Sequence, residues 1–345
     1  MAAASSSPSN AVAPAVRLRD SHGRVIHDLR VSITDRCNYK CVYCRTGEHG
    51  AQYPELPIDD YLRMIRLFVG LGIEKVRLTG GEPLLRHGLL DLLRELAGLR
   101  TLNDKPLDLA LTTNGHLLDS LAVPLKDAGL NRITVSMDAV DAPTFERITR
   151  IPGSFQKVLS GVRAARDAGL TPLKINCVLL RGFNDAEIEG FASFAREENV
   201  IVRFIEFMPL EEGRLWSPDI VVPLKEIVER ISRTQPLTPL PPRENSETAR
   251  RYTFPDGVGE IGIIAPVTQA FCGACSRVRL TSDGKIRTCL FSQFEHDLFG
   301  RIQAGASDED LSAYIAQTVY GKEARHHIGE PGFLKPSRSM VHIGG

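Results

Sequence analysis

Seven cysteines are the residues of this sequence best suited to metal chemistry, and six of them form two groups of three. The first group lies in the stretch CNYKCVYC and comprises Cys37, Cys41 and Cys44. The second group has the spacing Cys-x2-Cys-x13-Cys and comprises Cys272, Cys275 and Cys289. A secreted protein stabilised by disulfides would usually scatter its cysteines and pair them evenly. The two groups therefore predict metal sites in a reducing compartment.

Each group is one thiolate short of the four ligands that a structural zinc ion normally has. A distant residue such as His49 could complete a zinc site in the first group. Alternatively, three thiolates can hold a four-iron cluster in which one iron stays open to an exogenous ligand. The seventh cysteine, Cys177, could complete only one group, and its apolar surroundings predict a buried small side chain instead. Two incomplete groups favour clusters, but spacing alone leaves both alternatives open.

Strand-like apolar runs alternate with amphipathic helical patterns from residue 29 onward. We predict strands at residues 29–34, 75–79, 108–113, 132–137, 173–180 and 201–207. Helices are predicted between them, for example at residues 59–72 and 154–170. This alternation is typical of an α/β fold with a parallel sheet that is closed or partly closed as a barrel. The first cysteine group follows the first strand directly.

Polar residues recur on one face of several predicted strands. Side chains two positions apart share a face, so Lys75 lies beside Arg77, and Lys174 lies beside Asn176. The same period groups polar side chains on two other strands, namely Asp108 with Thr112 and Thr134 with Ser136. Edge strands with solvated faces are the alternative explanation. Because charged residues recur in several units, we predict a cavity for a polar ligand.

The charge balance restricts the classes of partner. Lysine and arginine total 42, as do aspartate and glutamate, which argues against bulk electrostatic binding to nucleic acid or a membrane. No apolar run reaches the roughly 18 residues that span a bilayer. Residues 1–16 lack the basic region and apolar core of a secretory signal, and we expect a disordered tail there. These features predict a cytoplasmic protein.

A proline-rich stretch near residue 235 predicts a domain boundary. We expect a barrel over residues 17–235 and a smaller region over residues 236–345 that carries the second cysteine group. His326 and His327 lie in the basic C-terminal tail and are expected to face solvent.

Two further features make the chain resemble the radical S-adenosylmethionine (SAM) enzymes. Tyr43 directly precedes the third cysteine of the first group. TGGEP, at residues 79–83, follows the second strand, and its glycines would let backbone groups approach the methionine part of SAM closely. From about residue 17 onward, the chain resembles the GTP 3′,8-cyclase family of molybdenum cofactor biosynthesis. The motifs that carry this resemblance are LRVSITDRCNYKCVYC, EKVRLTGGEPLLR, LTTNG, VSMDA, RFIEFMP, FCGACSRVRLTSDGKIRTCLF and the terminal GG.

The resemblance implies a partial (βα)6 TIM-like barrel and two [4Fe-4S] clusters. The cluster held by Cys37, Cys41 and Cys44 would bind SAM through its open iron and cleave it to methionine and a 5′-deoxyadenosyl radical. This radical would take hydrogen from C3′ of GTP, and C3′ would then bond to C8 of guanine. The auxiliary cluster, on Cys272, Cys275 and Cys289, would meet the guanine ring.

The resemblance also implies roles for individual residues. SAM contacts are expected from Tyr43, Gly81, Ser136 and Met208. GTP contacts are expected from Arg30, Arg77, Thr112, Lys174, Arg277 and Arg279. Catalytic roles are expected for Arg277, Arg279, Gly344 and Gly345. Apart from the resemblance, Lys75 and Arg203 are expected at cavity positions. The implied partners are an electron donor, a downstream cyclic pyranopterin monophosphate synthase and a second copy of the chain.

Two rival functions deserve comparison with this one. Radical SAM enzymes that modify peptides also carry auxiliary clusters, but they usually have more cysteines in their C-terminal part. Here only three cysteines follow the barrel, and they accompany an Arg-x-Arg motif. The other rival is a binding module stabilised by zinc. Anaerobically purified protein distinguishes the two classes, because iron and sulfide absorb visible light and zinc does not.

Overall fold

The computed structural model describes residues 17–44, 51–213 and 215–343. The predicted tail at residues 1–16, His49 and the terminal glycines Gly344 and Gly345 lie outside the described residues.

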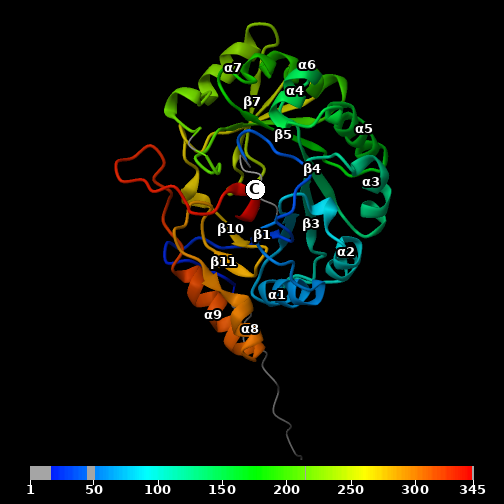
Figure 1. Cartoon of the computed structure of the whole chain (residues 1–345). Coiled ribbons are helices and arrows are strands. Elements are labelled where there is room, and N and C mark those ends of the chain that lie inside the picture. Colours follow the sequence, from blue (N-terminus) through cyan, green and yellow to red (C-terminus); the bar gives the residue numbers. More distant parts are fainter. Residues whose placement is uncertain (1–16, 45–50, 214, 344–345) are drawn as a thin grey trace, which may run out of the picture.

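Six parallel strands form the wall of an open barrel (Figure 1). They are β1 (Asp28–Ser32), β2 (Lys75–Thr79), β3 (Asp108–Thr113), β4 (Arg132–Ser136), β5 (Lys174–Leu179) and β6 (Ile201–Glu206). Each pairs in parallel with the next strand along the chain. The predicted α/β barrel is confirmed, and the predicted strand ends differ from these by one or two residues at most.

Helices cover the outside of this barrel (Figure 1). They are α1 (Ile58–Gly70), α2 (Leu89–Ala97), α3 (Leu118–Asp127), α4 (Ala142–Thr149), α5 (Ser154–Asp167), α6 (Ile188–Glu197) and α7 (Leu224–Ser232). In α1, the fully buried residues have helical spacing and form one face toward the sheet: Tyr61, Met64, Ile65 and Phe68. Burying one such side chain contributes about 1.5–3 kcal/mol. Cys177 on β5 belongs to the same core and is fully buried, as predicted.

The C-terminal region extends the sheet at both edges, giving twelve strands in all among the described residues. β9 (Glu260–Ile264) pairs in parallel with β6 and continues antiparallel into β8 (Ala249–Thr253) and β7 (Thr238–Leu240). At the other edge, β10 (Arg277–Leu280) pairs in parallel with β1 and continues antiparallel into β11 (Lys285–Arg287) and β12 (His296–Asp297). The sheet is therefore continuous past residue 235, and the domain boundary there stays a prediction.

The remaining helices are α8 (Leu298–Gln303), α9 (Asp308–Tyr320) and α10 (Met340–Ile343). Short 3-10 turns are η1 (Pro83–Leu85), η2 (Asp185–Glu187), η3 (Pro218–Ile220) and η4 (Cys272–Ala274). Figure 1 shows the C-terminal segment, in red, turning back toward the middle of the ring of strands. The last helix thus lies at the barrel and not on its outer surface.

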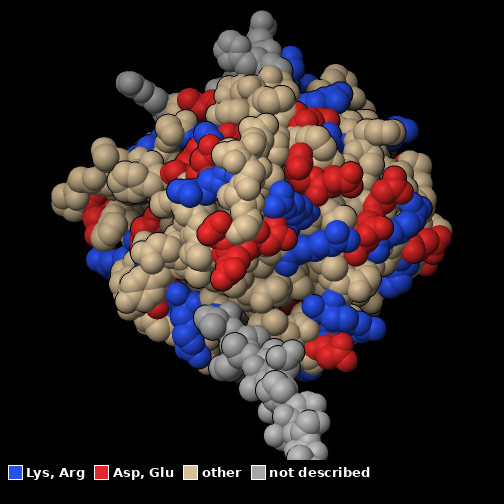
Figure 2. Space-filling model, turned by 90° about the horizontal axis from the view of Figure 1, so that it is seen from below, with Lys and Arg blue, Asp and Glu red and all other residues tan. Residues whose placement is uncertain are grey.

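The surface agrees with the balanced charge of the sequence. On the face seen in Figure 2, Lys and Arg are interspersed with Asp and Glu. Among the described residues, no helix has both the length and the apolar character needed to cross a bilayer.

Candidate active site

A cavity at the carboxyl ends of the barrel strands is lined by both cysteine groups. This is the end at which parallel α/β folds usually bind ligands. Of the predicted site residues, this cavity brings together Arg30, Cys37, Cys41, Tyr43, Cys44, Gly81, Thr112, Ser136, Met208, Cys272, Cys275, Arg277, Arg279 and Cys289. These positions are scattered over the sequence, so the fold creates a single site from several separate motifs.

A second, more polar cavity adjoins the first. Arg77 and Lys174 line it, together with Lys75, which sequence analysis also placed at a cavity. Arg30, Arg203 and Arg277 line both cavities, so the two are adjacent. The predicted cationic strand face is confirmed as the lining of a cavity.

The first cysteine loop is held by backbone and aromatic contacts. The amides of Lys40 and Val42 donate to the carbonyls of Thr149 and Ile148 at the end of α4, at 3.2 and 3.0 Å. The Tyr43 hydroxyl donates to Asp138 Oδ2 at 2.6 Å, which fixes the ring beside the third cysteine. The loop is therefore held in place by its own protein contacts.

The glycines of TGGEP are required by the packing of the protein itself. A Cβ at Gly81 would lie 2.3 Å from the carbonyl oxygen of Arg36, and one at Gly80 would lie 2.4 Å from that of Thr34. The Gly81 amide donates to the Thr34 carbonyl at 2.8 Å. The TGGEP backbone therefore lies so close to the segment that enters the cysteine loop that only glycine fits. This is a second reason for these glycines, besides the predicted contact with SAM.

Glu82, in the same motif, braces the ends of two strands. Its Oε1 accepts hydrogen bonds from the Leu84 amide at 2.9 Å and the Thr113 hydroxyl at 2.7 Å. Its Oε2 accepts from the Asn114 amide at 2.7 Å. Burial raises the pKa of Glu82 to about 7, although these hydrogen bonds oppose the rise. The carboxylate thus links the turn after β2 to the end of β3.

Thiolate side chains of this number and type suit iron–sulfur clusters. Among the described residues, no three His, Cys, Asp or Glu side chains converge closely enough to hold one metal ion. Cluster thiolates each bind a different iron, so they can lie further apart than ligands that share one zinc ion. The alternative zinc site with His49 falls outside the described residues.

The cysteines differ in how readily they form thiolates, also within the second group, where burial raises the pKa of Cys289. Burial raises the pKa of the Cys275 thiol, but the nearby cations Arg277, Lys322 and Arg24 more than offset this and lower it to about 7. Burial, and then Asp138, hold the pKa of Cys41 well above its usual range. Metal binding to the first group must therefore displace a proton from Cys41.

The second cavity concentrates positive charge in a buried space. Burial, and then Arg203, Arg132 and Arg77, lower the pKa of Lys174 to about 7. Burial and Arg30 likewise lower the pKa of Arg77 to about 10. Each cation here makes the charged form of its neighbours less stable, and a bound polyanion would stabilise all of these charges.

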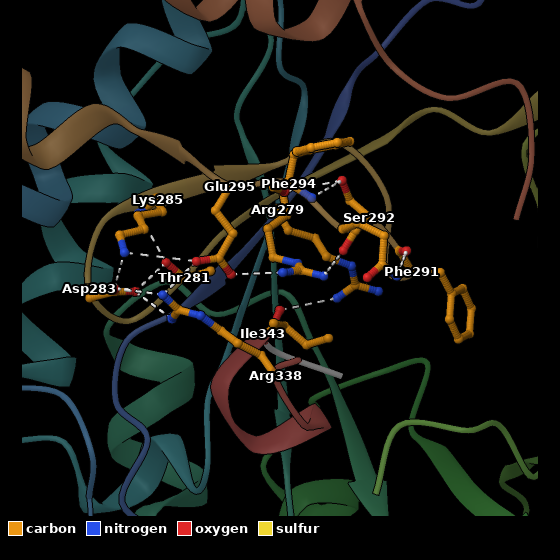
Figure 3. Close-up of polar contacts among 12 residues, drawn as sticks. Arg279, Thr281, Asp283, Lys285, Phe291, Ser292, Phe294, Glu295, Arg338 and Ile343 are labelled. Atoms are coloured by element: carbon orange, nitrogen blue, oxygen red, sulfur yellow. Dashed lines mark hydrogen bonds and ion pairs between the residues drawn. The ribbon is translucent and has the colours of Figure 1, made fainter. Parts of the chain in front are cut away.

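Two arginines on β10 extend this positive charge toward the second cysteine group. Arg277 donates to the Ser246 carbonyl at 3.1 Å and lies 5.5 Å from the centre of the Phe271 ring. Arg279 is 5% exposed and donates to the Ile343 carbonyl at 3.4 Å (Figure 3). Arg30 lies opposite Arg279 in the register of β1 with β10, so their side chains share one face of the sheet.

Some residues around the second cysteine group were not found by sequence reasoning. Arg24 donates to the carbonyls of Cys272 at 2.9 Å and Ala324 at 2.8 Å, and it pairs with Asp20. The buried Lys322 donates to the Thr288 carbonyl. Arg24 and Cys272 are 248 positions apart, so no local pattern could have signalled their contact.

One prediction about the histidines was wrong. His326 is half-buried, lines the cavity and packs against Phe291 with ring centres 5.2 Å apart. The segment after α9 contacts the strand end that carries Cys289, through Lys322 and Glu323. His326, which follows in this segment, is thereby brought against the cavity. His327 is exposed, as predicted.

Comparisons with known proteins agree across the whole fold. The Radical SAM superfamily model matches residues 31–195, and the Molybdenum Cofactor Synthesis C model matches residues 200–328. A GTP 3′,8-cyclase from Moorella thermoacetica is 43% identical over 95% of this chain and 100% of its own length. One from Acidothermus cellulolyticus is 43% identical over 88% of this chain and 84% of its own.

A solved structure supports the architecture alone. The crystal structure of Streptococcus suis SuiB bound to S-adenosylmethionine superposes with a TM-score of 0.61 at 14% identity. The match covers 87% of this chain and 68% of that one.

Proposed function

Because this chain belongs to the GTP 3′,8-cyclase family, we propose that it converts GTP to (8S)-3′,8-cyclo-7,8-dihydroguanosine 5′-triphosphate and cleaves SAM to 5′-deoxyadenosine and methionine. This is the first step of molybdenum cofactor biosynthesis. The observation that carries the proposal is the cavity lined by both cysteine groups, which adjoins a cationic cavity. Radical chemistry and a polyanionic substrate require these two features side by side.

Two [4Fe-4S] clusters and SAM supply the radical chemistry when bound. The residues proposed to hold the SAM cluster are Cys37, Cys41 and Cys44, and those proposed to hold the auxiliary cluster are Cys272, Cys275 and Cys289. Tyr43, Gly81, Ser136 and Met208 are proposed to bind SAM, because they line the cavity that contains the first group. Met208 follows the end of β6, and Ser136 ends β4, so SAM would lie along the upper rim of the barrel.

The GTP triphosphate fits the cationic cavity. Arg77 and Lys174 would neutralise its outer phosphates, while Arg30 and Arg277, at the junction, would hold the part nearer the ribose. Thr112 and Arg279 line only the cavity that contains the cysteines, so they would contact the nucleoside. This orientation places the ribose and base between the two cysteine groups and the charge away from them.

The proposal extends to partners and location. The reaction needs an external electron donor, and its product would pass to a cyclic pyranopterin monophosphate synthase. We further propose a homodimer and a cytoplasmic location, in which thiolates stay reduced.

A direct assay tests the proposed reaction. The reconstituted protein is incubated anaerobically with GTP, SAM and dithionite, and the products are separated by chromatography and identified by mass spectrometry. We expect 5′-deoxyadenosine together with a nucleotide of the same mass as GTP and altered retention. If 5′-deoxyadenosine forms without any new nucleotide, and a peptide added in place of GTP is modified, the rival peptide-modifying activity is favoured.

GTP affinity is expected to depend on pH through Lys174. Its pKa is about 7 in the free protein, and a bound triphosphate raises it, so binding is coupled to proton uptake. Affinity is therefore full below pH 7 and falls by up to about tenfold per pH unit as the pH rises above 7. Calorimetry between pH 7.5 and 8.5, in buffers of different ionisation enthalpy, measures the uptake. Lys174→Arg keeps the charge and should remove the dependence, and an equal dependence in that variant would exclude Lys174 as its source.

Gly344 and Gly345 lie outside the described residues, and the last described residue, Ile343, is buried at the end of α10. We expect deletion of both glycines to lower cyclisation by roughly tenfold, because backbone and carboxylate can enter a crowded cavity only without side chains. Iron content and thermal stability should not change, since chain ends seldom support the fold. Full activity in the deleted protein would show that these glycines are only a chain end.

A further inference from the structure

A buried ion-pair network joins the C-terminal segment to the turn between β10 and β11 (Figure 3). Arg338 Nη1 and Nη2 lie 2.7 and 2.8 Å from the two carboxylate oxygens of Asp283. Arg338 Nη2 also lies 2.6 Å from Glu295 Oε2. The Arg338 side chain is only 7% exposed, and its guanidinium lies 4.3 Å from the centre of the Tyr53 ring. Two parallel contacts to one carboxylate fix both the position and the orientation of the arginine.

Both carboxylates of this network are held by further hydrogen bonds or ion pairs. Asp283 also accepts a hydrogen bond from the Thr281 hydroxyl at 2.6 Å. Burial raises the pKa of Asp283, but hydrogen bonds from Arg338 and Thr281 more than offset this and lower it to about 2. Glu295 is fixed in turn by Arg287, at 2.7 Å. The turn therefore offers a rigid, ionised partner to the incoming Arg338.

The segment that follows Arg338 forms part of the cavity wall. α10 begins two residues later, and the Met340 amide donates to the Leu210 carbonyl at 3.0 Å. Met340 and Val341 line the cavity, and Ile343 is fully buried against Leu210 and Phe291. Arg279 of β10 donates to the Ile343 carbonyl. The same hairpin thus holds both ends of the segment, through Asp283 at Arg338 and through Arg279 at Ile343.

The second of these attachments is weak alone. The bond from Arg279 to Ile343 is 3.4 Å long, near the limit of a hydrogen bond. α10 has four residues, too few to form a stable helix without tertiary support. A buried ion pair, by contrast, is a poor source of net stability but leaves few alternative arrangements. The Met340 bond and the burial of Ile343 keep the segment in the cavity wall, and the Arg338 network adds a fixed position and orientation where the segment begins.

We propose that Arg338 is a positioning residue for the reaction, which acts by fixing α10 so that the Ile343 carbonyl orients the Arg279 guanidinium toward the substrate. This inference rests on the proposed function for its kinetic consequence, but not for its structural one. Arg338 itself touches neither cysteine group and does not line either cavity. Its effect on catalysis is thus indirect, through Ile343 and Arg279.

Hydrogen–deuterium exchange of the reconstituted holoenzyme tests the structural part. In Arg338→Ala, the peptide that contains residues 340–343 should lose protection by about tenfold or more, while peptides of β1–β6 keep theirs. Lys285→Ala is the matched control. Lys285 pairs with Asp283 at 3.4 Å and with Glu295 at 3.9 Å, but it belongs to β11 and does not hold the tail. Unchanged protection in Arg338→Ala, or an equal loss in Lys285→Ala, would overturn the proposal.

Product partition tests the kinetic part. Arg338→Ala and Asp283→Ala should each lower cyclisation by about tenfold while SAM cleavage continues, so more 5′-deoxyadenosine forms per cyclised nucleotide. The double variant should be no worse than Arg338→Ala alone, because Arg338→Ala already removes the ion pair with Asp283. Additive losses, or a fall in both products together, would contradict the positioning role.

A conservative variant covers the case in which Arg338→Ala does not fold. Arg338→Lys keeps the charge but loses the two parallel contacts, so protection and product ratio should fall between those of the wild type and Asp283→Ala. Wild-type behaviour of Arg338→Lys in both measurements would refute the need for a fixed orientation. If the wild type forms no cyclised nucleotide, the proposed function fails, while the exchange measurement still decides whether Arg338 fixes α10.

Discussion

A Cys275→Ser protein is expected to retain about half of the iron of the reconstituted wild type, because it loses only the auxiliary cluster. Serine is a poor ligand for iron in place of a thiolate, and each cluster has just three protein ligands in this proposal. The same result is expected for Cys272→Ser and Cys289→Ser. SAM cleavage should persist in these variants, whereas cyclisation should stop.

Substitution in the first group should stop SAM cleavage as well as cyclisation. Cys41→Ser is expected to abolish SAM cleavage and cyclisation together, because no open iron remains to bind SAM. Cys177→Ser is the matched control, since Cys177 is fully buried in the core and lines neither cavity. It should keep the iron content of the wild type. Iron and sulfide analysis, with quantification of 5′-deoxyadenosine and of the cyclised nucleotide, tests all five variants. Unchanged iron in Cys275→Ser would refute the auxiliary cluster.

Arg277→Ala and Arg279→Ala are expected to weaken GTP binding by about ten- to hundredfold each. Both arginines line the cavity with the second cysteine group, and a hydrogen bond between charged groups contributes roughly 1.5–3 kcal/mol. Neither residue is a cluster ligand in our proposal, so both variants should keep their full iron content. Equilibrium binding of GTP to the anaerobic, SAM-free protein measures the effect.

Arg250→Ala is the control for this pair, because Arg250 is an exposed arginine on β8 that lines neither cavity. Its affinity for GTP should match that of the wild type. Wild-type affinity in both Arg277→Ala and Arg279→Ala would show that these arginines serve only the packing of β10.

The barrel could be predicted from the sequence because its signals are local. Each strand from β1 to β6 is a short apolar run between turn residues, and the period of two within β2 and β5 placed Arg77 and Lys174 on the inner face. The cysteine spacing and TGGEP are likewise continuous in sequence. These features need no knowledge of tertiary contacts.

What could not be predicted depends on contacts between distant segments. The position of Arg30 opposite Arg77 depends on the register in which β1 and β2 pair, which the sequence of either strand alone does not determine. Contacts between segments that are far apart in the sequence fix the positions of Arg24, Arg338 and His326. An arginine in a tail is usually solvated, and only its buried partners show that Arg338 is fixed.

Transfer of deuterium from GTP to SAM-derived product tests the central claim most directly. The reconstituted protein is incubated anaerobically with dithionite, SAM and GTP deuterated at C3′, and 5′-deoxyadenosine is analysed by mass spectrometry. Our account predicts that the 5′-deoxyadenosine carries one deuterium and that the cyclised nucleotide has lost it. Unlabelled 5′-deoxyadenosine formed alongside intact GTP would contradict the account, because hydrogen would then come from a source other than C3′.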